Sequence, residues 1–178
     1  MSIFDLRVET ERLWLRPPSA EDFAAFAAFC ADPVAMEHLG GVQAPSVAWR
    51  GLATLTGSWQ LLGYSMFSVI EKDSGRWVGR VGPWQPHGWP GPEVGWSIVP
   101  SCWGRGYAPE AARAAIDWAF DVLGWDEVIH TIAPDNRNSQ AVARKLGSRV
   151  LRATRLPAPH EVDVEVWGQS RQAWQARR

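Results

Sequence analysis

A short loop with two glycines, Gly104 and Gly106, stands between a strand-like segment and a helix-like segment. The segment before the loop, Val94–Val99, is rich in β-branched and aromatic residues, and the segment after it, Glu110–Leu123, has apolar residues at helical spacing. Glycine lets the chain turn sharply and leaves room for a ligand beside the backbone. The first turn of a helix presents unpaired N–H groups at the positive end of its dipole. This arrangement predicts an anion site suited to a pyrophosphate.

The glycine loop by itself is a weak signal, because phosphate-binding loops of several protein classes contain similar glycines. No Gly-Lys-Ser/Thr sequence ends the loop, which excludes the phosphate loop of nucleotide hydrolases. No G-x-G-x-x-G sequence opens an N-terminal strand–helix–strand unit, which excludes the dinucleotide fingerprint. A strand-to-helix turn that binds no ligand is the open alternative.

A second group of polar residues, 135–139, follows the strand-like segment Val128–Ala133. It precedes a helix-like segment that ends in Arg-Lys-Leu-Gly at 144–147. One interpretation of these residues is helix capping by Asn136 or Asn138, whose side chains are suited to accept hydrogen bonds from the first turn. The two motifs share one plan, in which a strand leads through a polar loop into a helix.

Together the two motifs resemble those of the GNAT superfamily of N-acetyltransferases. The loop 103–108, Trp-Gly-Arg-Gly-Tyr-Ala, is similar to the family's acyl-CoA pyrophosphate loop, Gln/Arg-x-x-Gly-x-Gly/Ala, with Gly106 and Ala108 at its last two fixed positions. Trp103 replaces the Gln/Arg residue, as is usual in the branch that contains the ribosomal-protein alanine acetyltransferases. Asn136 and Ser139 match the family's Asn-x-x-Ser pattern. The resemblance covers roughly residues 8–150.

The resemblance implies an enzyme that transfers the acetyl group of acetyl-CoA to a primary amine, either a protein N-terminus or a small-molecule amine. It implies that the exposed backbone of Ile98 and Val99 pairs with the pantetheine arm, and that the Val99 N–H polarises the thioester carbonyl. Asn136 is expected to contact the pantetheine. The backbone N–H groups expected to bind the pyrophosphate are those of Gly104, Arg105, Gly106 and Ala108.

Glu93 is the candidate for the base that takes the proton of the attacking amine. It begins the strand that carries Ile98 and Val99, and a carboxylate at this place can accept the proton directly or through a water molecule. His87 in the preceding loop is the alternative base, because imidazole titrates near neutral pH. An ordinary exposed acid at a strand end is the other interpretation of Glu93.

Ser139 is the candidate for the group that assists the departing thiolate. Many relatives carry a tyrosine for this task in the helix after the second motif, but that position is Ala143 here. The Ser139 hydroxyl is the nearest substitute, since it can donate a hydrogen bond to sulfur. Helix capping is the alternative role of Ser139. The missing tyrosine also leaves open a second function, a non-catalytic acyl-CoA-binding or regulatory module.

The elements that must position these residues follow one another irregularly along the chain. Pro and Gly residues and the spacing of apolar residues mark their bounds. Strands are predicted at 10–16, 64–71, 77–84, 93–99, 127–133, 149–155 and 162–167. Helices are predicted at 21–31, 45–62, 110–123 and 138–146, with a short one from 170. This order indicates a mixed α/β protein and not an alternating βα fold.

The resemblance adds the GNAT fold, a mostly antiparallel sheet flanked by helices and splayed at its middle, where the co-substrate inserts between two neighbouring strands. The acceptor amine is expected in a pocket formed by residues 21–63 and by the last two strands. The dipeptide Glu37-His38 lies on this side in the related branch. The sequence does not identify the amine.

Length and composition agree with one enzyme domain over residues 1–178, of which 46% are hydrophobic. The formal net charge of −1, with 18 basic and 19 acidic residues, argues against a nucleic-acid binder. No apolar run approaches a membrane span, and residues 1–5 lack the start of a signal peptide. Two distant cysteines without metal-type spacing to the four histidines predict a cytoplasmic protein without a metal cofactor. A homodimer is an open alternative to a monomer.

Overall fold

The computed structural model describes residues 5–177, and residues 1–4, on which most of the signal-peptide expectation rests, lie outside the described residues. Within 5–177, eight strands form one sheet in the order β1-β2-β3-β4-β5-β6-β8-β7. All neighbours are antiparallel except β5 and β6, which are parallel. The strands are β1 (Val8–Glu9), β2 (Leu13–Arg16), β3 (Phe67–Glu71), β4 (Trp77–Trp84), β5 (Glu93–Ile98), β6 (Glu127–Ile132), β7 (Arg149–Arg155) and β8 (Asp163–Ser170).

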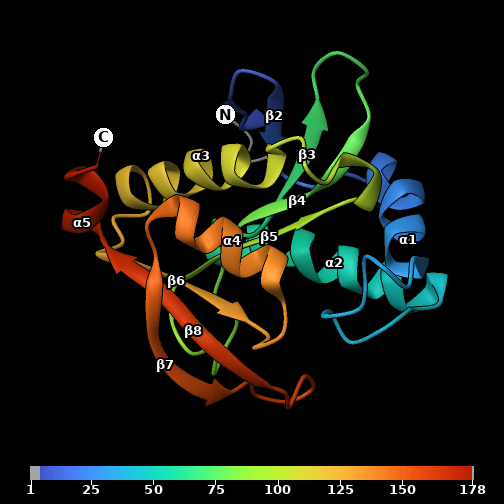
Figure 1. Cartoon of the computed structure of the whole chain (residues 1–178). Coiled ribbons are helices and arrows are strands. Elements are labelled where there is room, and N and C mark those ends of the chain that lie inside the picture. Colours follow the sequence, from blue (N-terminus) through green and yellow to red (C-terminus); the bar gives the residue numbers. More distant parts are fainter. Residues whose placement is uncertain (1–4, 178) are drawn as a thin grey trace.

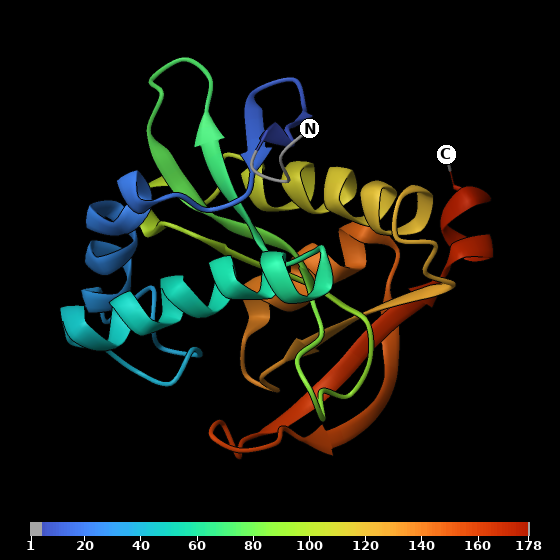
Figure 2. The same cartoon turned by 180° about the vertical axis from the view of Figure 1, so that it is seen from behind.

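Helices cover both faces of the sheet (Figure 1). The helices are α1 (Phe23–Ala31), α2 (Pro45–Leu62), α3 (Tyr107–Asp121), α4 (Arg137–Leu146) and α5 (Arg171–Gln175). The pair α3 and α4 lies on one face, and the view from behind shows α1 and α2 on the other (Figure 2). The predicted mixed α/β class with a mostly antiparallel sheet is confirmed.

The larger hydrophobic cluster packs α3 against the middle of the sheet. Ala111, Ala115 and Ile116 of α3 are fully buried in it, and the small alanines let the helix lie close to the strands. A second cluster fills the space between α1, α2 and the sheet, with Phe26 and Leu52 among its buried residues. The two clusters hold the sheet rigidly between its helices, so the loops at the strand ends start from fixed positions.

The predicted helix 45–62 has the observed bounds, with proline at its first position and Gly63 in the left-handed conformation that ends it. The predicted strand 10–16 was wrong in its first half. Thr10 donates its hydroxyl hydrogen to Glu110 of α3 at 2.6 Å, and the Arg12 N–H bonds to the same oxygen at 2.9 Å. The second bond occupies the Arg12 backbone N–H, and the Thr10 N–H bonds to the Leu13 carbonyl at 3.0 Å, so the chain turns between β1 and β2.

Helix α3 begins at Tyr107, three residues before the predicted start, because Gly106 already takes the N-cap position with φ +80°. The strand predicted from 64 begins at Phe67, and the final strand extends to Ser170. No helix within residues 5–177 combines the length and the apolarity that crossing a bilayer requires.

Candidate active site

The sheet opens between β5 and β6. Their backbone pairing is confined to Glu93 opposite Ile129, where the Ile129 N–H bonds to the carbonyl of Pro92 at 2.9 Å. Further along, hydrogen bonds to side chains replace the backbone hydrogen bonds between the two strands. The Thr131 N–H donates to the Glu93 carboxylate at 3.0 Å. The splay expected at the middle of the sheet is confirmed, and it leaves the backbone of both strands accessible from the gap.

His130 supplies the second side-chain bridge across this gap. Its Nδ1 lies 2.7 Å from the Val94 carbonyl and its Nε2 lies 2.9 Å from the Ser148 hydroxyl. Burial lowers the pKa of His130 to about 4, so the ring is neutral, and the carbonyl partner places its hydrogen on Nδ1. Ser148 stands where the resembling family has phenylalanine, and here its hydroxyl completes a buried chain from Gln169 to His130.

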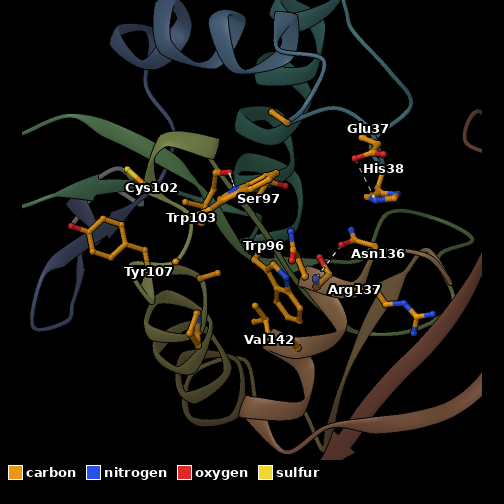
Figure 3. Close-up of a pocket in the computed structure, with 18 of the residues that line it drawn as sticks. Glu37, His38, Trp96, Ser97, Cys102, Trp103, Tyr107, Asn136, Arg137 and Val142 are labelled. Atoms are coloured by element: carbon orange, nitrogen blue, oxygen red, sulfur yellow. Dashed lines mark hydrogen bonds and ion pairs between the residues drawn. The ribbon is translucent and has the colours of Figure 1, made fainter.

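A pocket of about 590 Å³ lies at the open end of the gap, between the glycine loop, the start of α4 and residues 34–39 (Figure 3). We call it the glycine-loop pocket. Of the predicted co-substrate residues, those that line it are Ile98, Gly104, Gly106, Ala108 and Asn136.

The glycine loop is held open by backbone conformation and by anchoring side chains. Gly104 and Gly106 have φ of +75° and +80°, a region that disfavours side chains. The Tyr107 hydroxyl donates to Glu71 at 2.5 Å, and the Arg105 guanidinium pairs with Glu71 at 2.9 Å. Hydrogen bonds from Ser74 and then Tyr107 lower the pKa of Glu71 to about 2, so the anchor stays ionised across the neutral range. The first N–H groups of α3 therefore face the pocket from a fixed loop.

One of the backbone roles expected at this pocket needs correction. The Val99 N–H donates to the Val78 carbonyl of β4 at 2.9 Å, so it is not free to polarise a thioester. The Arg105 side chain turns to Glu71 and its carbonyl accepts a hydrogen bond from Arg12 at 2.8 Å, so the role of its backbone N–H stays a prediction. The sequence pattern places residues in a loop but does not say which backbone groups neighbouring strands already use.

The groups that do face the gap follow from the alternation of a strand. Because the Val99 N–H points to β4 and the Val94 carbonyl meets β6, the N–H groups of Trp96 and Ile98 point toward the gap. The carbonyl of Ile98 accepts a hydrogen bond from the Trp103 indole at 2.7 Å, so part of the expected pairing edge is already used. The tryptophan that replaces Gln/Arg in the loop thereby ties the loop to β5.

The sequence motifs did not single out two cations at the glycine-loop pocket. Arg137 and Lys145 of α4 line it across from the N-terminus of α3, so an anion in the pocket meets positive charge from both sides. The sequence signal that could have found them is helical spacing. Residues 137, 141, 142 and 145 share one face of the helix that follows the second motif. The donor set fits a pyrophosphate group.

A second pocket, of about 820 Å³, lies beside the first and shares part of its lining. We call it the Glu93 pocket. Its lining comes from β4 and β5, from residues 37–43 and from the final hairpin around residues 156–164, as expected for the acceptor pocket. His87, the alternative base, is exposed and lines neither pocket.

Glu93 is buried at 6% exposure, so the interpretation as an exposed strand-end acid is wrong. Burial raises the pKa of Glu93 to about 7, against the opposing effect of hydrogen bonds from Thr131 and Trp89. The Thr131 hydroxyl lies 3.0 and 3.1 Å from the two carboxylate oxygens, and the Trp89 indole donates to one of them. A carboxyl group with this pKa exchanges protons at neutral pH.

Ser139 lies at the boundary of the two pockets and lines both. Its backbone N–H donates to the Asn136 side chain at 3.0 Å, so Asn136 caps α4 and the Ser139 hydroxyl does not. Within residues 5–177 the hydroxyl makes no hydrogen bond, which leaves it available to a ligand. Ala143 is fully buried against Ile132 and Trp167, so its position faces the core and not the pockets.

The two pockets meet where β5 passes the start of α4. The residues common to both linings are Glu37, His38, Leu39, Trp96, Ser97, Asn136 and Ser139. In Figure 3, Trp96 stands at the centre, with Asn136 on one side and Ser97 and Trp103 on the other. A group bound along the glycine-loop pocket therefore ends beside a second molecule in the Glu93 pocket.

Comparison with known proteins agrees with this arrangement. The chain matches the Acetyltransferase (GNAT) domain family over residues 12–149. An acetyltransferase structure from Agrobacterium tumefaciens is 30% identical, with 96% of each chain covered and a TM-score of 0.83. The N-acetyltransferase YnaD of Bacillus subtilis, itself uncharacterised, is 27% identical over 145 residues, which are 81% of this chain and 83% of that protein.

The fold is also that of RimJ from Mycobacterium smegmatis, whose structure is a complex with CoA-disulfide. The two chains are 20% identical, with 90% of this chain and 82% of RimJ covered and a TM-score of 0.69. The family match covers more than half of the chain, including both motifs and the strands that open between them. This protein belongs to the GNAT family of acetyltransferases.

Proposed function

We propose that this protein is an acetyl-CoA-dependent N-acetyltransferase that acetylates a primary amine by direct attack on the thioester. The observation that carries the proposal is the junction of the two pockets. The glycine-loop pocket offers N–H groups and cations to a pyrophosphate. The Glu93 pocket offers a carboxyl group whose pKa of about 7 lets it exchange protons at neutral pH. Trp96 and Ser139 lie where the two pockets meet, which is where an acetyl group and an amine would come together.

Each side chain then has a defined task. Acetyl-CoA supplies the activated acetyl group as a thioester. Glu93 accepts the proton that the amine gives up as the C–N bond forms. The gap-facing N–H groups of Trp96 and Ile98 orient the arm that carries the acetyl group. The C–S bond breaks as the amide forms. The Ser139 hydroxyl donates a hydrogen bond to the departing thiolate, which takes up a proton from solvent while Glu93 returns its proton to solvent.

The test is the release of free thiol from acetyl-CoA in the presence of a panel of primary amines, with acetylated product identified by mass. Amine-dependent thiol release supports the enzyme. Tight CoA binding without release for any amine would support the non-catalytic acyl-CoA module, which the buried Ala143 at the tyrosine position keeps open.

Ser139→Ala is expected to lower kcat by about tenfold or more with little change in the acetyl-CoA KM, because the hydrogen bond to sulfur strengthens only in the transition state. Since Asn136 and not Ser139 caps α4, the variant should keep its thermal stability. Asn136→Ala is the matched control and should lose about 1 kcal/mol of unfolding free energy. Steady-state kinetics and thermal melts on both variants show whether Ser139 assists the departing thiolate or caps α4. An unchanged kcat in Ser139→Ala contradicts assistance to the thiolate.

We also propose that residues 1–178 act as one domain and that the protein works in the cytoplasm. The single sheet over 8–170 supports the first statement, and the two free, buried cysteines Cys30 and Cys102 support the second. The branch of ribosomal-protein alanine acetyltransferases stays the nearest resemblance for the loop with Trp103.

A further inference from the structure

One cation of the Glu93 pocket has no role in the chemistry described above. Arg80 of β4 lines this pocket, and no other lysine or arginine among residues 5–177 does. Its Nε is buried without a hydrogen-bond partner, and its guanidinium makes no hydrogen bond or ion pair to any described residue. A buried polar group of this kind is paired in nearly all native proteins.

The surroundings of Arg80 do not neutralise it. From α1 it is faced by the Phe26 ring, whose centroid lies 5.7 Å from the guanidinium carbon, and by the thiol of Cys30. Glu93 interacts with it at longer range, but the Glu93 oxygens are occupied by Thr131 and Trp89. Burial lowers the pKa of Arg80, yet a guanidinium remains charged at neutral pH. The free protein therefore bears the cost of a partly buried and poorly compensated cation.

Arg80 and Glu93 lie on the same face of the sheet with space between them. Arg80 is opposite Ser97 in the register of β4 and β5, and Gly95 and Glu93 follow on that face of β5. Arg80, Gly95 and Glu93 all line the same cavity, and the Met66 methyl group packs beside Gly95, 2.7 Å from the position of an added Cβ. One small molecule in the pocket can reach both charged groups.

We propose that Arg80 binds a carboxylate of the acceptor, so that the substrates are amines that carry a carboxylate close to the amino group. The inference rests on the proposed N-acetyltransferase function and names its substrate class. A guanidinium holds a carboxylate through two parallel hydrogen bonds, which would satisfy the buried Nε. A phosphate fits less well, because the same pocket contains Glu37, Glu93 and Asp163 and a single cation.

The kinetic test compares matched acceptors. Free amino acids are compared with amino-acid amides, and peptide amides that begin with Asp or Glu are compared with those that begin with Asn or Gln. In one of the two sets, we expect the acid member to have a kcat/KM about 10- to 100-fold higher than its amide. The set that shows this preference tells whether the acceptor is a free amino acid or a peptide that begins with an acidic residue. Equal kcat/KM for the acid and amide members of both sets would overturn the inference.

Arg80→Met should remove that preference by lowering kcat/KM for the carboxylates alone, and Arg80→Lys should retain part of it. CoA affinity should stay unchanged in both. Because Met has a similar volume and no charge, the Arg80→Met protein should unfold at the same or a higher temperature than the wild type. Equal losses for acids and amides, together with a lower melting temperature, would return Arg80 to a structural role.

A binding measurement separates this inference from the proposed function. The side-chain Nε–H signal of Arg80 in ¹⁵N-arginine-labelled protein, assigned by its absence in Arg80→Lys, is followed while glutamate or glutamine amide is added to the CoA-loaded chain. A shift with glutamate alone is expected. If the signal shifts but no amine is acetylated, the enzyme function fails and the anion site stands. If amines are acetylated and the signal does not move, the enzyme function stands and the carboxylate-binding role of Arg80 is wrong.

Discussion

Replacing Glu93 with glutamine is expected to lower kcat/KM by roughly 10²–10⁴ near neutral pH while CoA binding stays intact. The carboxyl group lies in the acceptor-side pocket, is buried, and has a pKa of about 7. Glutamine has nearly the same volume but cannot accept a proton. Steady-state kinetics with a responsive amine and calorimetric titration with CoA measure the two quantities on one sample. A loss of only two- or threefold would contradict the base role.

The pH profile gives an independent check. A base must be deprotonated, so kcat/KM should be low below pH 7 and rise to a plateau as the pH passes the pKa of Glu93, about 7. The Thr131 hydroxyl lies within hydrogen-bond distance of both carboxylate oxygens, and its hydrogen bond lowers that pKa. Thr131→Val removes this donor at similar volume, so the midpoint of the profile should move to higher pH. If the midpoint does not move, the group that titrates in the profile is not Glu93.

Gly106→Glu is expected to weaken CoA binding by well over tenfold. Gly106 is the N-cap of α3 at φ +80°, and its backbone lies where the resemblance places the pyrophosphate. A glutamate adds negative charge at this anion site and places a side chain in a backbone region that disfavours one. Calorimetry with CoA measures the loss, and an unchanged affinity in a folded Gly106→Glu protein would exclude the site.

Two control variants separate charge from backbone strain. Gly106→Ala adds the strain without the charge and should retain more of the affinity. Gly124→Glu introduces the same residue just beyond the C-terminal end of α3, at φ +71° with open space around the added Cβ. CoA affinity should be unchanged there, because the added charge lies at the opposite end of the helix.

The elements of the fold were largely predictable from local sequence. The bounds of α2 follow from Pro45 at its start and Gly63 at its end, and both glycine-loop positions have the positive φ that the motif suggested. These features depend on the conformational preferences of single residues, so the sequence contains them directly. The position of the glycine-loop pocket between the two motifs followed from the same local signals and from the resemblance to the GNAT family.

What local sequence did not determine was how residues from distant elements affect one another. The Val99 N–H looked free in the strand, but its neighbour β4 occupies it through Val78. The sequence left Glu93 open as a candidate base or an exposed strand-end acid, but packing buries it, and its raised pKa is a property of that burial. Hydrogen-bond occupancy and desolvation depend on which elements meet in space, and no local pattern encodes them.

Arg80 shows the same division most clearly. Its position among apolar residues of strand 77–84 is visible in the sequence, where it resembles an ordinary outward-facing residue. Only the tertiary structure puts α1 over it, leaves its Nε without a partner and places it in one cavity with Glu93. The sequence by itself therefore determined the family and the conformation of the glycine loop, because these depend on short motifs. The tertiary structure decided the charge and shape of the Glu93 pocket, because these are sums over residues far apart in the chain.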